Sequence, residues 1–442
     1  MRYDVRAFGA RGDGGALDHW AIQKAIDCCH RGGGGTVEIP AGRYLCGTIR
    51  LRSNVCLCLE AGATILAAED PTLFHEIART PFGNHPGRIQ ALLWADDAEN
   101  VTVSGQGTVD GRKDGPLAVS GSEPLRFRPV IAFYRNCRNV KFLDVTFRNA
   151  DMWTLHLMRC DGVMVRGVSI LNCIDRINSD GIDPDGCRNV TISDCHIVAG
   201  DDCIVIKSTE GDVCENITVS NCVLSTKCAA LKIGTEAIGD IRNITFSNCV
   251  IHDTRVALAL YMKDGSTYEN MIFSNMTIEA DGQFPILVDV TPRYYKEPKK
   301  GRIRNVQFEN VNITSPGRCL VEGLPDAPIE NLSFRNVTWN VSGACKTDAT
   351  KPGGTRRQER DPEAPNYAEK PYHFVAAHVE GLEVSGLKMI DRREDSTPDR
   401  GLFYLRGVKS GRLESAWPFR TPIETPPVRT EECERVDVRL PE

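Results

Sequence analysis

A short sequence motif, called the phrase, recurs along the chain and limits the folds that the chain can adopt. The phrase starts with Asn, or in a few copies with Gly, and continues with apolar residues at alternate positions. Its clearest copies are Asn189-VTISDCHI, Asn216-ITVSNCVL, Asn243-ITFSNCVI, Asn270-MIFSNMTI, Asn305-VQFENVNI and Asn331-LSFRNVTW. The starts lie 27, 27, 27, 35 and 26 residues apart. A regular period in this range is typical of solenoids, in which each repeat packs against its neighbours.

The alternation within each phrase is the periodicity of a strand rather than of a helix. Further strand-like segments follow in each period, such as Cys203-IVIK and Ala230-LKI. No helical segment long enough for a β-α-β crossover intervenes, so a doubly wound sheet is excluded. The sequence therefore predicts an all-β fold: a single-stranded right-handed parallel β-helix in which each strand pairs with its copy one turn further on.

Two residue types recur at fixed repeat positions. Asn at the phrase start tolerates a left-handed backbone, and its amide can hydrogen-bond along a ladder of equivalent residues, so we interpret it as structural. Many of the 18 cysteines also recur in register, among them Cys195, Cys222 and Cys249. We interpret these as small stacked hydrophobes, with a disulfide framework as the alternative.

We expect residues 1–442 to form one β-helix domain. Residues 1–35 would hold an N-terminal strand and a capping helix, 36–340 the main coils, 341–373 a long loop, and 374–442 the last coils and a C-terminal tail. The helix is predicted from Asp18-HWAIQKAIDCCHRG, which places apolar residues on one side and ends in glycines.

Charge and hydropathy limit the partners and the location that we expect for this chain. The net charge is −6, with acidic and basic residues interspersed, so we expect no nucleic-acid partner. No apolar run of about 18 residues is present, so no membrane span is predicted. The start MRYDVRAFGARGDGG lacks the apolar core of a signal peptide, which favours a cytoplasmic location. We expect no cofactor and no structural metal, and nothing in the sequence indicates an oligomeric state.

Two consecutive repeats carry acidic motifs, Asn178-Ser-Asp-Gly and Gly200-Asp-Asp-Cys. Aligning the strands that follow places Asp180 over Asp202, one strand spacing or roughly 4.8 Å apart. Stacked carboxylates repel one another, which favours retention of a proton on one of them. Because a glycosidase needs one carboxyl to protonate the leaving oxygen and another to activate water, we predict Asp180, Asp201 and Asp202 as catalytic. A calcium site or solvated turn acids are the structural alternative.

These motifs and the strand after them resemble glycoside hydrolase family 28, the polygalacturonase family. The resemblance runs from Phe8-GARGDGG through Trp153-TLHLMRC and Asn178-SDGIDPDGC to Pro365-NYAEKPYHF, and it is strongest to bacterial exo-acting members. It implies an inverting O-glycosyl hydrolase that degrades a pectin-like oligosaccharide or polysaccharide containing galacturonate or rhamnose. It also implies that Asp201 is the general acid, while Asp180 and Asp202 position and deprotonate water.

The next repeats depart from the family's pattern. Polygalacturonases place Gly-His-Gly where this chain has Cys228-Ala-Ala, and Arg-Ile-Lys where it has Tyr261-Met-Lys. A guanidinium fork for a substrate carboxylate is therefore missing at this place. Rhamnogalacturonan hydrolases also lack that histidine, so the sugar at the scissile bond stays open.

Several side chains near these motifs are candidates for substrate contact: Asn178, Lys232, Lys263, Tyr261, Trp153, His156, Glu236 and Arg293. Alternation places Lys232 on the outer face, between two inward apolar residues. Trp153 fits a core position equally well, and a lone histidine such as His156 is usually structural. Tyr294 and Tyr295 follow Arg293 and are expected to close the site.

Two other functions stay open. A polysaccharide lyase on the same fold would form an unsaturated product and lose activity in chelator. A non-catalytic carbohydrate-binding β-helix would bind sugar without forming product.

Overall fold

The computed structural model describes residues 1–79, 88–116, 128–293, 299–343, 365–392, 400–415 and 425–440. The chain falls into two compact units, which are described one at a time. Unit 1 is Met1–Val205 with Cys214–Leu224, and unit 2 is Ile206–Val213 with Ser225–Glu442. Two strands, β22 (Ile204–Ser208) and β24 (Val223–Ala237), contain residues of both units.

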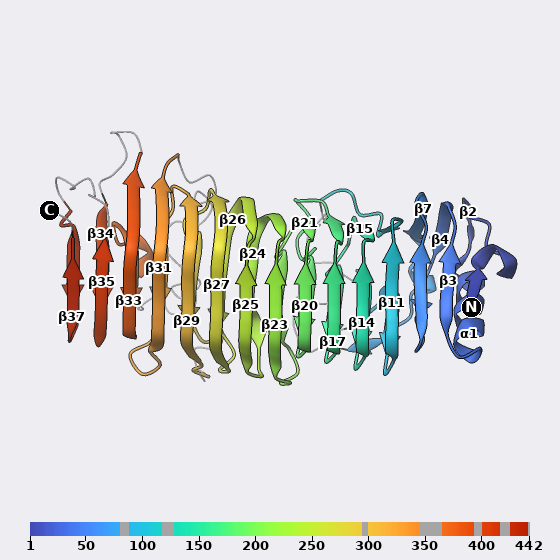
Figure 1. The fold of residues 1–442 in the computed structure, drawn as a ribbon, viewed down its shortest axis with the longest axis horizontal. Coiled ribbons are helices and arrows are strands. Elements are labelled where there is room, and N and C mark those ends of the chain that lie inside the picture. The colour runs from blue at the N-terminus through green and yellow to red at the C-terminus, as the bar shows by residue number, and fades with distance from the viewer. Residues whose placement is uncertain are drawn as a thin grey trace. The chain divides into compact units, whose positions relative to one another are not determined.

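The strands described in unit 1 form three parallel ladders, to which successive turns of the chain contribute strands (Figure 1). The first consists of β1 (Arg2–Asp4), β3 (Gly35–Ile39), β6 (Val55–Leu59), β11 (Glu99–Gly105), β14 (Arg138–Leu143), β17 (Asp161–Arg166), β20 (Arg188–Ser193) and β23 (Cys214–Ser220). The second consists of β2 (Asp13–Leu17), β4 (Gly42–Cys46), β7 (Ala63–Ala67), β12 (Thr108–Asp110), β15 (Thr146–Arg148), β18 (Ser169–Leu171) and β21 (His196–Ala199). The third consists of β5 (Ile49–Arg50), β10 (Ala91–Asp96), β13 (Val130–Arg135), β16 (Leu155–Met158) and β19 (Ile182–Asp185). Outside these ladders, β8 (Ala78–Arg79) pairs antiparallel with β9 (Arg88–Ile89).

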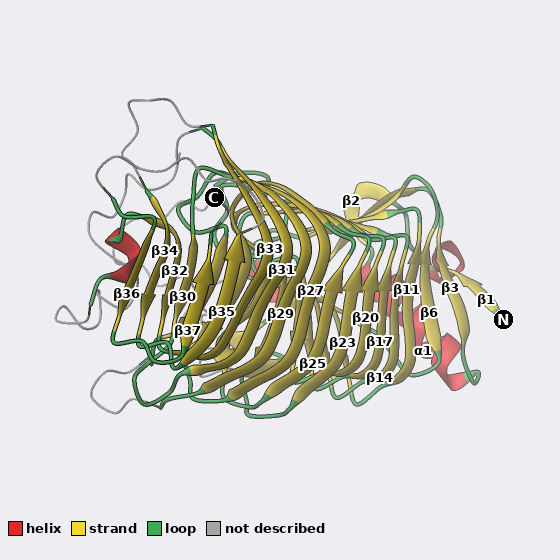
Figure 2. Ribbon diagram, turned by 60° about the vertical axis from the view of Figure 1, so that its left-hand side comes forward, coloured by secondary structure: helices red, strands yellow, loops and turns green. Residues whose placement is uncertain are grey.

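The predicted capping helix is present as α1 (His19–Arg31), which follows the short helix η1 (Val5–Phe8) and ends at Gly32. Its buried side chains include Ile22 and Ile26, spaced one helical turn apart. Figure 2 shows α1 beside β3 and β6, next to the N-terminus. The helix thereby covers apolar edges of the first coils, as the end of a solenoid requires.

Unit 2 is built from longer strands in two parallel ladders. One consists of β25 (Ile241–Ser247), β27 (Thr267–Ala280), β29 (Arg302–Thr314), β31 (Ile329–Val341), β33 (Val379–Asp391), β35 (Ser410–Ser415) and β37 (Val436–Arg439). The other consists of β26 (Val250–Met262), β28 (Ile286–Val290), β30 (Cys319–Glu322), β32 (Tyr372–Ala377), β34 (Gly401–Arg406) and β36 (Val428–Glu431). Inside the first ladder four phenylalanine rings stack, with centroids 4.7 to 4.9 Å apart: Phe246, Phe273, Phe308 and Phe334.

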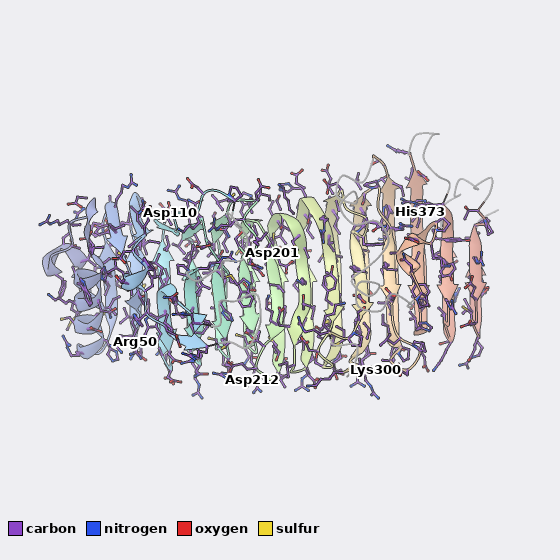
Figure 3. All side chains as sticks on the ribbon, turned by 180° about the vertical axis from the view of Figure 1, so that it is seen from behind. Arg50, Asp110, Asp201, Asp212, Lys300 and His373 are labelled. Atoms are coloured by element: carbon purple, nitrogen blue, oxygen red, sulfur yellow. The ribbon has the colours of Figure 1, made fainter. Side chains whose placement is uncertain are left out.

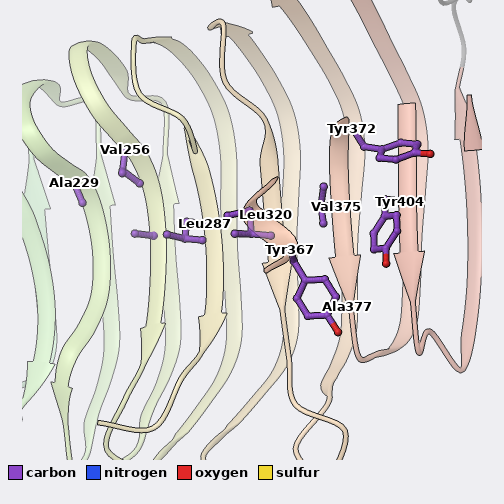
Figure 4. Packing of buried hydrophobic residues seen from close by; sticks show 11 residues of the cluster. Ala229, Val256, Leu287, Leu320, Tyr367, Tyr372, Val375, Ala377 and Tyr404 are labelled. Carbon is purple, nitrogen blue, oxygen red and sulfur yellow. The ribbon is translucent and has the colours of Figure 1, made fainter. Parts of the chain in front are cut away.

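A second apolar cluster of unit 2 contains residues that occupy the same register position on β28, β30 and β32. Leu287, Leu320 and Val375 are paired in sequence along these strands, and all are buried (Figure 4). Tyr367, in the short helix η4 (Tyr367–Glu369), belongs to the same cluster. The segment that contains η4 therefore packs against these strands.

The interpretation of the recurring asparagines is confirmed. Asn139 and Asn305 adopt left-handed φ values of 51° and 56°. In unit 1 the Asn139 Nδ2 donates to Asn100 Oδ1 at 2.7 Å. In unit 2 the Asn305 amide donates to Asn270 and accepts from Asn331, both at 3.1 Å. Where Asn occupies the position in neighbouring turns, a side-chain amide ties one turn to the next.

The recurring cysteines are buried, as expected of stacked hydrophobes. Cys195 is 2% exposed, and Cys222 and Cys249 are each 1% exposed. The cysteines within the described ranges are free thiols. Burial in a repeated inward position, rather than cross-linking, accounts for their spacing.

The predicted fold, an all-β right-handed parallel β-helix with an N-terminal helix, is confirmed. The predicted long loop at 341–373 falls largely on residues 344–364, which lie outside the described ranges. The strand after it, β32, begins at Tyr372, slightly before the predicted last coils. The assignment of 1–442 to one domain stays a prediction. Among the described residues, no helix has the length and apolar character needed to span a membrane.

Candidate active site

The backbone of unit 1 fixes the register of the two acidic motifs. Leu155 pairs with Ile182, and its N–H donates to the Gly181 carbonyl at 3.0 Å. With the same offset, the Gly181 N–H donates to the Asp202 carbonyl at 2.9 Å. This offset pairs Asp180 with Asp202 on the next turn, one strand spacing or about 4.8 Å away. The structure therefore shows the stacking that the sequence alignment predicted.

The three acids differ in exposure. Asp180 is 2% exposed and Asp202 is 1% exposed, whereas Asp201 is only partly buried. The Asp201 Oδ2 accepts a hydrogen bond from the Asn178 N–H at 3.0 Å. Asn178 can present its N–H there because it adopts a left-handed φ of 58°. Asp201 is thus the most accessible of the three, and Asn178 orients it.

A buried arginine holds the turn that carries Asn178. Arg128, 2% exposed, donates to Asn178 Oδ1 at 2.9 Å, to the Ile177 carbonyl at 2.6 Å and to Asp151 Oδ1 at 3.1 Å. The Arg176 Nε also donates to Asp151 at 3.1 Å. Burial lowers the pKa of Arg128, and the charge of Asp151 opposes that shift. Sequence reasoning missed these three charged residues, because no local motif links positions some 50 residues apart.

The peptide carbonyl of Asp180 is also anchored. Thr154 donates to it twice, from its N–H at 2.9 Å and from its hydroxyl at 2.7 Å. The Asn172 amide donates to the Thr154 hydroxyl at 2.8 Å and to the Ser179 carbonyl at 3.1 Å. The positive charge of Arg128 acts on Asp180 as well. Asp180 therefore sits on a backbone that several buried hydrogen bonds fix.

Trp153 and His156 lie in packed surroundings. The register places Trp153 beside Asp180, yet its side chain is 8% exposed and belongs to an apolar cluster with Phe133. Its ring meets that of His156 edge-on, with centroids 4.7 Å apart. His156 is 1% exposed, and its Nε2 lies 3.1 Å from Asp185 Oδ2. Both residues thus have structural partners, and their contact with substrate stays a prediction.

In unit 2, Glu236 is surrounded by cations. Its Oε2 accepts from Lys207 Nζ at 3.2 Å, and Arg293 Nη2 lies 3.7 Å from Oε1. Burial raises the pKa of Glu236, but Lys207, Lys232 and Arg293 outweigh burial and bring it to about 2. Arg293 in turn forks onto Asp264 at 2.6 and 2.9 Å. Glu236 is therefore ionised near neutral pH and cannot serve there as a proton donor.

Sequence reasoning did not single out Lys207 or Asp264, although both lie in this network. Glu236 itself lies within β24, which continues to Ala237.

Tyr261 lies between two lysines. The Nζ atoms of Lys232 and Lys263 are each 5.4 Å from the centroid of its ring. Lys232 is 8% exposed, while Lys263 is 1% exposed and pairs with Asp289. Asp289 therefore balances the charge of Lys263. A contact between Lys263 and a substrate carboxylate would have to compete with this ion pair.

The structure thus gathers the predicted site residues into two groups. Asn178, Asp180, Asp201 and Asp202 come together in unit 1. In unit 2, Lys232, Glu236 and Arg293 form one charged group, and Tyr261 with Lys263 adjoins Lys232 through ring contacts. Tyr294 and Tyr295 lie outside the described residues.

Residues 29–352 match the family model for glycosyl hydrolases family 28. The matched range contains every predicted site residue.

Individual relatives and structures agree with this match. A probable polygalacturonase of Vitis vinifera is 32% identical over 213 residues, which cover 46% of this chain and 43% of that protein. The match thus spans less than half the length of the relative. The exopolygalacturonase of Thermotoga maritima superposes with a TM-score of 0.65 and 26% identity, over 78% of this chain and 87% of that one. The family 28 exopolygalacturonase of Yersinia enterocolitica gives a TM-score of 0.74 at 20% identity, over 92% and 78% of the two chains, which shows likeness of fold.

Proposed function

Because the chain belongs to glycosyl hydrolases family 28, we propose that it hydrolyses a glycosidic bond of a pectin-like oligosaccharide, from a chain end and with inversion. The exo-acting part of the proposal is supported by the structural similarity to the exopolygalacturonase of Thermotoga maritima.

One observation carries the proposal: Asp180 and Asp202 are stacked on adjacent turns, with Asp201 beside them on the turn of Asp202. Inverting glycosidases separate their two carboxyl groups by about 6.5–9.5 Å, which leaves room for a water molecule. In the proposed roles this separation is the one between Asp201, as acid, and Asp180, as base. The two residues are one turn and one residue apart, so their backbones lie about 6 Å from each other, which is compatible with this range.

In the proposed reaction Asp201 donates a proton to the leaving oxygen. Its partial exposure favours this role, and the hydrogen bond from Asn178 orients its carboxyl group. Asp180 and Asp202 hold the attacking water and accept its proton. Because the water attacks the face of the sugar opposite the leaving oxygen, each released sugar has the anomeric configuration opposite to that of the cleaved bond.

The proposed substrate contains galacturonate, rhamnose or both. Lys232 and Arg293 supply positive charge around Glu236, which favours an acidic sugar nearby. The replacement of the family's arginine by Tyr261 removes a bidentate carboxylate contact. Rhamnose at one side of the scissile bond is therefore part of the proposal.

Asp201→Asn tests the proposal. The amide has nearly the same shape but no proton to give, so we expect turnover of pectic oligosaccharides to fall by about a thousandfold or more while folding is kept. Asp144→Asn is the matched control, because Asp144 is exposed at a left-handed corner that Asn occupies in other turns. Near-normal turnover by Asp201→Asn would remove it as the acid.

The products separate this proposal from its alternatives. A proton NMR time course on pectic oligosaccharides reports the sugar released and its first-formed anomer. A lyase would instead form an unsaturated product that absorbs in the near ultraviolet. Binding without any product would indicate a carbohydrate-binding protein.

A further inference from the structure

Unit 1 contains a cavity of about 400 Å³ that the proposed reaction does not use. Its lining comes from the first half of α1, from β5 and the residues close to it on either side, from the segment around η2 (Pro71–Leu73) and from β10. It includes Trp20, Arg50, Arg52, His75 and Trp94. Its volume lies within the range of small-molecule sites, about 300–1,000 Å³.

Aromatic rings form much of the lining. Trp20 is 67% exposed although its side chain is large and apolar. Trp94 lies deeper, with the His75 ring edge-on at 5.9 Å and the Arg50 guanidinium carbon 4.6 Å from the ring centroid. Exposed and half-buried indoles provide flat apolar faces on which the C–H face of a sugar ring can pack.

The cavity also holds a guanidinium group that has no direct ion pair among the described residues. Arg52 pairs with Asp27 at 3.1 Å, whereas Arg50 makes no ion pair with any residue in the described ranges. Burial lowers the pKa of Arg50, the charge of Arg52 lowers it further, and the charges of Asp96, Asp27 and Asp97 oppose these shifts. A guanidinium group presents a planar fork that suits a carboxylate.

Three lining residues have polar atoms without a hydrogen-bond partner in the part of the chain that the structure describes. They are His19 Nδ1, Arg50 Nε and Trp94 Nε1, and all three atoms are buried. His19 as a whole is 4% exposed. Buried polar atoms without partners cost free energy, and a ligand rich in hydroxyl and carboxylate groups can supply those partners.

The cavity is separate from the candidate active site. Arg50 lies four register steps from Asp183 along the third ladder of unit 1, which is about 19 Å. Between them Phe133 and His156 are buried, so packed side chains fill the intervening face. Figure 3 shows Arg50 on the first coils, well away from Asp201.

We propose that this cavity is a second, non-catalytic binding site for an acidic sugar, with a uronate carboxylate on Arg50 and a sugar ring against Trp20. The choice of a uronate rests on the proposed function, while the preference for an anion with apolar ring faces rests on the cavity itself.

Titration calorimetry with trigalacturonate tests the inference, using the full chain with Asp201→Asn so that the ligand is not consumed. We expect two bound molecules per chain. Adding Arg50→Met or Trp20→Ala weakens one of the two sites by about tenfold or more, since a charge-assisted hydrogen bond or a large stacking surface is lost. Arg31→Ala is the matched control, because Arg31 is exposed on the same helix but does not line the cavity.

Neutral galactotriose is expected to leave the second site empty. One bound trigalacturonate in all variants would overturn the inference, as would Arg50→Met and Trp20→Ala titrations that both match Arg31→Ala. Trp20→Ala keeps the test valid if Arg50→Met fails to fold, because Trp20 is largely exposed. Hydrolysis by the unmodified chain is assayed separately, so failure of the proposed function is recognised independently of the titration.

Discussion

Individual charged residues differ in how completely the protein balances their charge. Lys263 is buried against Asp289, and Glu236 is held ionised by its cationic neighbours. Asp201 is partly exposed and accepts a hydrogen bond from Asn178. A group that donates a proton to the substrate has to reach the substrate. Asp201 meets this requirement better than Asp180, Asp202 or Glu236.

The low pKa of Glu236 predicts a pH-dependent contribution to stability. The folded value is about 2 against an ordinary 4.5. A depressed carboxyl pKa adds stability that is complete above the ordinary value and disappears as the pH falls toward 2. The contribution is on the order of 3 kcal/mol. We therefore expect Glu236→Gln to lower the melting temperature at neutral pH, and the gap from the unmodified chain to narrow below about pH 4.5.

Calorimetric melting at a series of pH values measures this gap. Glu279→Gln serves as control, since Glu279 is an exposed glutamate on β27. A gap that stays constant through the acid range would show that Glu236 is not held ionised by its neighbours.

Arg128 is predicted to act on the proposed reaction by positioning Asn178. Arg128→Lys keeps the charge, but one ammonium cannot reproduce the bonds to Asn178, Ile177 and Asp151. We expect kcat to fall by about tenfold or more with a smaller change in KM, because the Asn178 N–H orients the carboxyl group of Asp201, the proposed acid. Steady-state kinetics on the best oligosaccharide substrate measures both.

Arg188→Lys is the matched control for Arg128→Lys, because Arg188 is exposed and only 3.5 Å from Glu215 in a surface pair. Equal effects of the two substitutions on kcat would refute a positioning role for Arg128.

Single turns are tied together by the asparagine ladder and by stacked aromatic rings. The ladder works because a left-handed corner recurs at one place in every turn, which brings the amides within reach of each other. The phenylalanine stack in unit 2 follows from the same translation, since residues in register on adjacent strands face the same way.

Two substitutions of Asn305 separate what the amide hydrogen bonds and the left-handed backbone each contribute to the stability of a corner. Asn305→Gly removes two amide hydrogen bonds, at about 0.5–1.5 kcal/mol each, but keeps the left-handed backbone accessible. Asn305→Ala loses the same bonds and adds about 1–2 kcal/mol of backbone strain. We expect both to destabilise, Ala more than Gly, in urea unfolding followed by circular dichroism.

Asn312→Ala is the control, because Asn312 is exposed in the extended part of β29. If Asn305→Ala were no more destabilising than Asn312→Ala, the ladder would not contribute to stability.

For the molecule as a whole, the repeated burial of thiols predicts insensitivity to reductant. The described cysteines are free, and those at the repeat position are almost fully buried. Excess dithiothreitol should therefore leave the melting temperature unchanged, as differential scanning calorimetry would show. A clear drop in reductant would instead support the alternative of a disulfide framework.

In this fold, particular side chains decide the function. A parallel β-helix offers the same outer positions on successive turns, so the fold class by itself does not mark one turn as reactive. The acidic pair, the charged group around Glu236 and the cavity at Arg50 are distinguished only by their side chains.

The sequence by itself determined the fold class, the capping helix, the asparagine ladder and the stacking of Asp180 on Asp202. These follow from strand periodicity and a constant repeat, and both are local properties that translation along the coil turns into contacts. Only the tertiary structure decided that Arg128 holds the turn of Asn178, that Lys263 is neutralised by Asp289, and that a cavity adjoins Arg50. Such partners come from distant positions, and which charges pair depends on packing and burial, which no spacing in the sequence records.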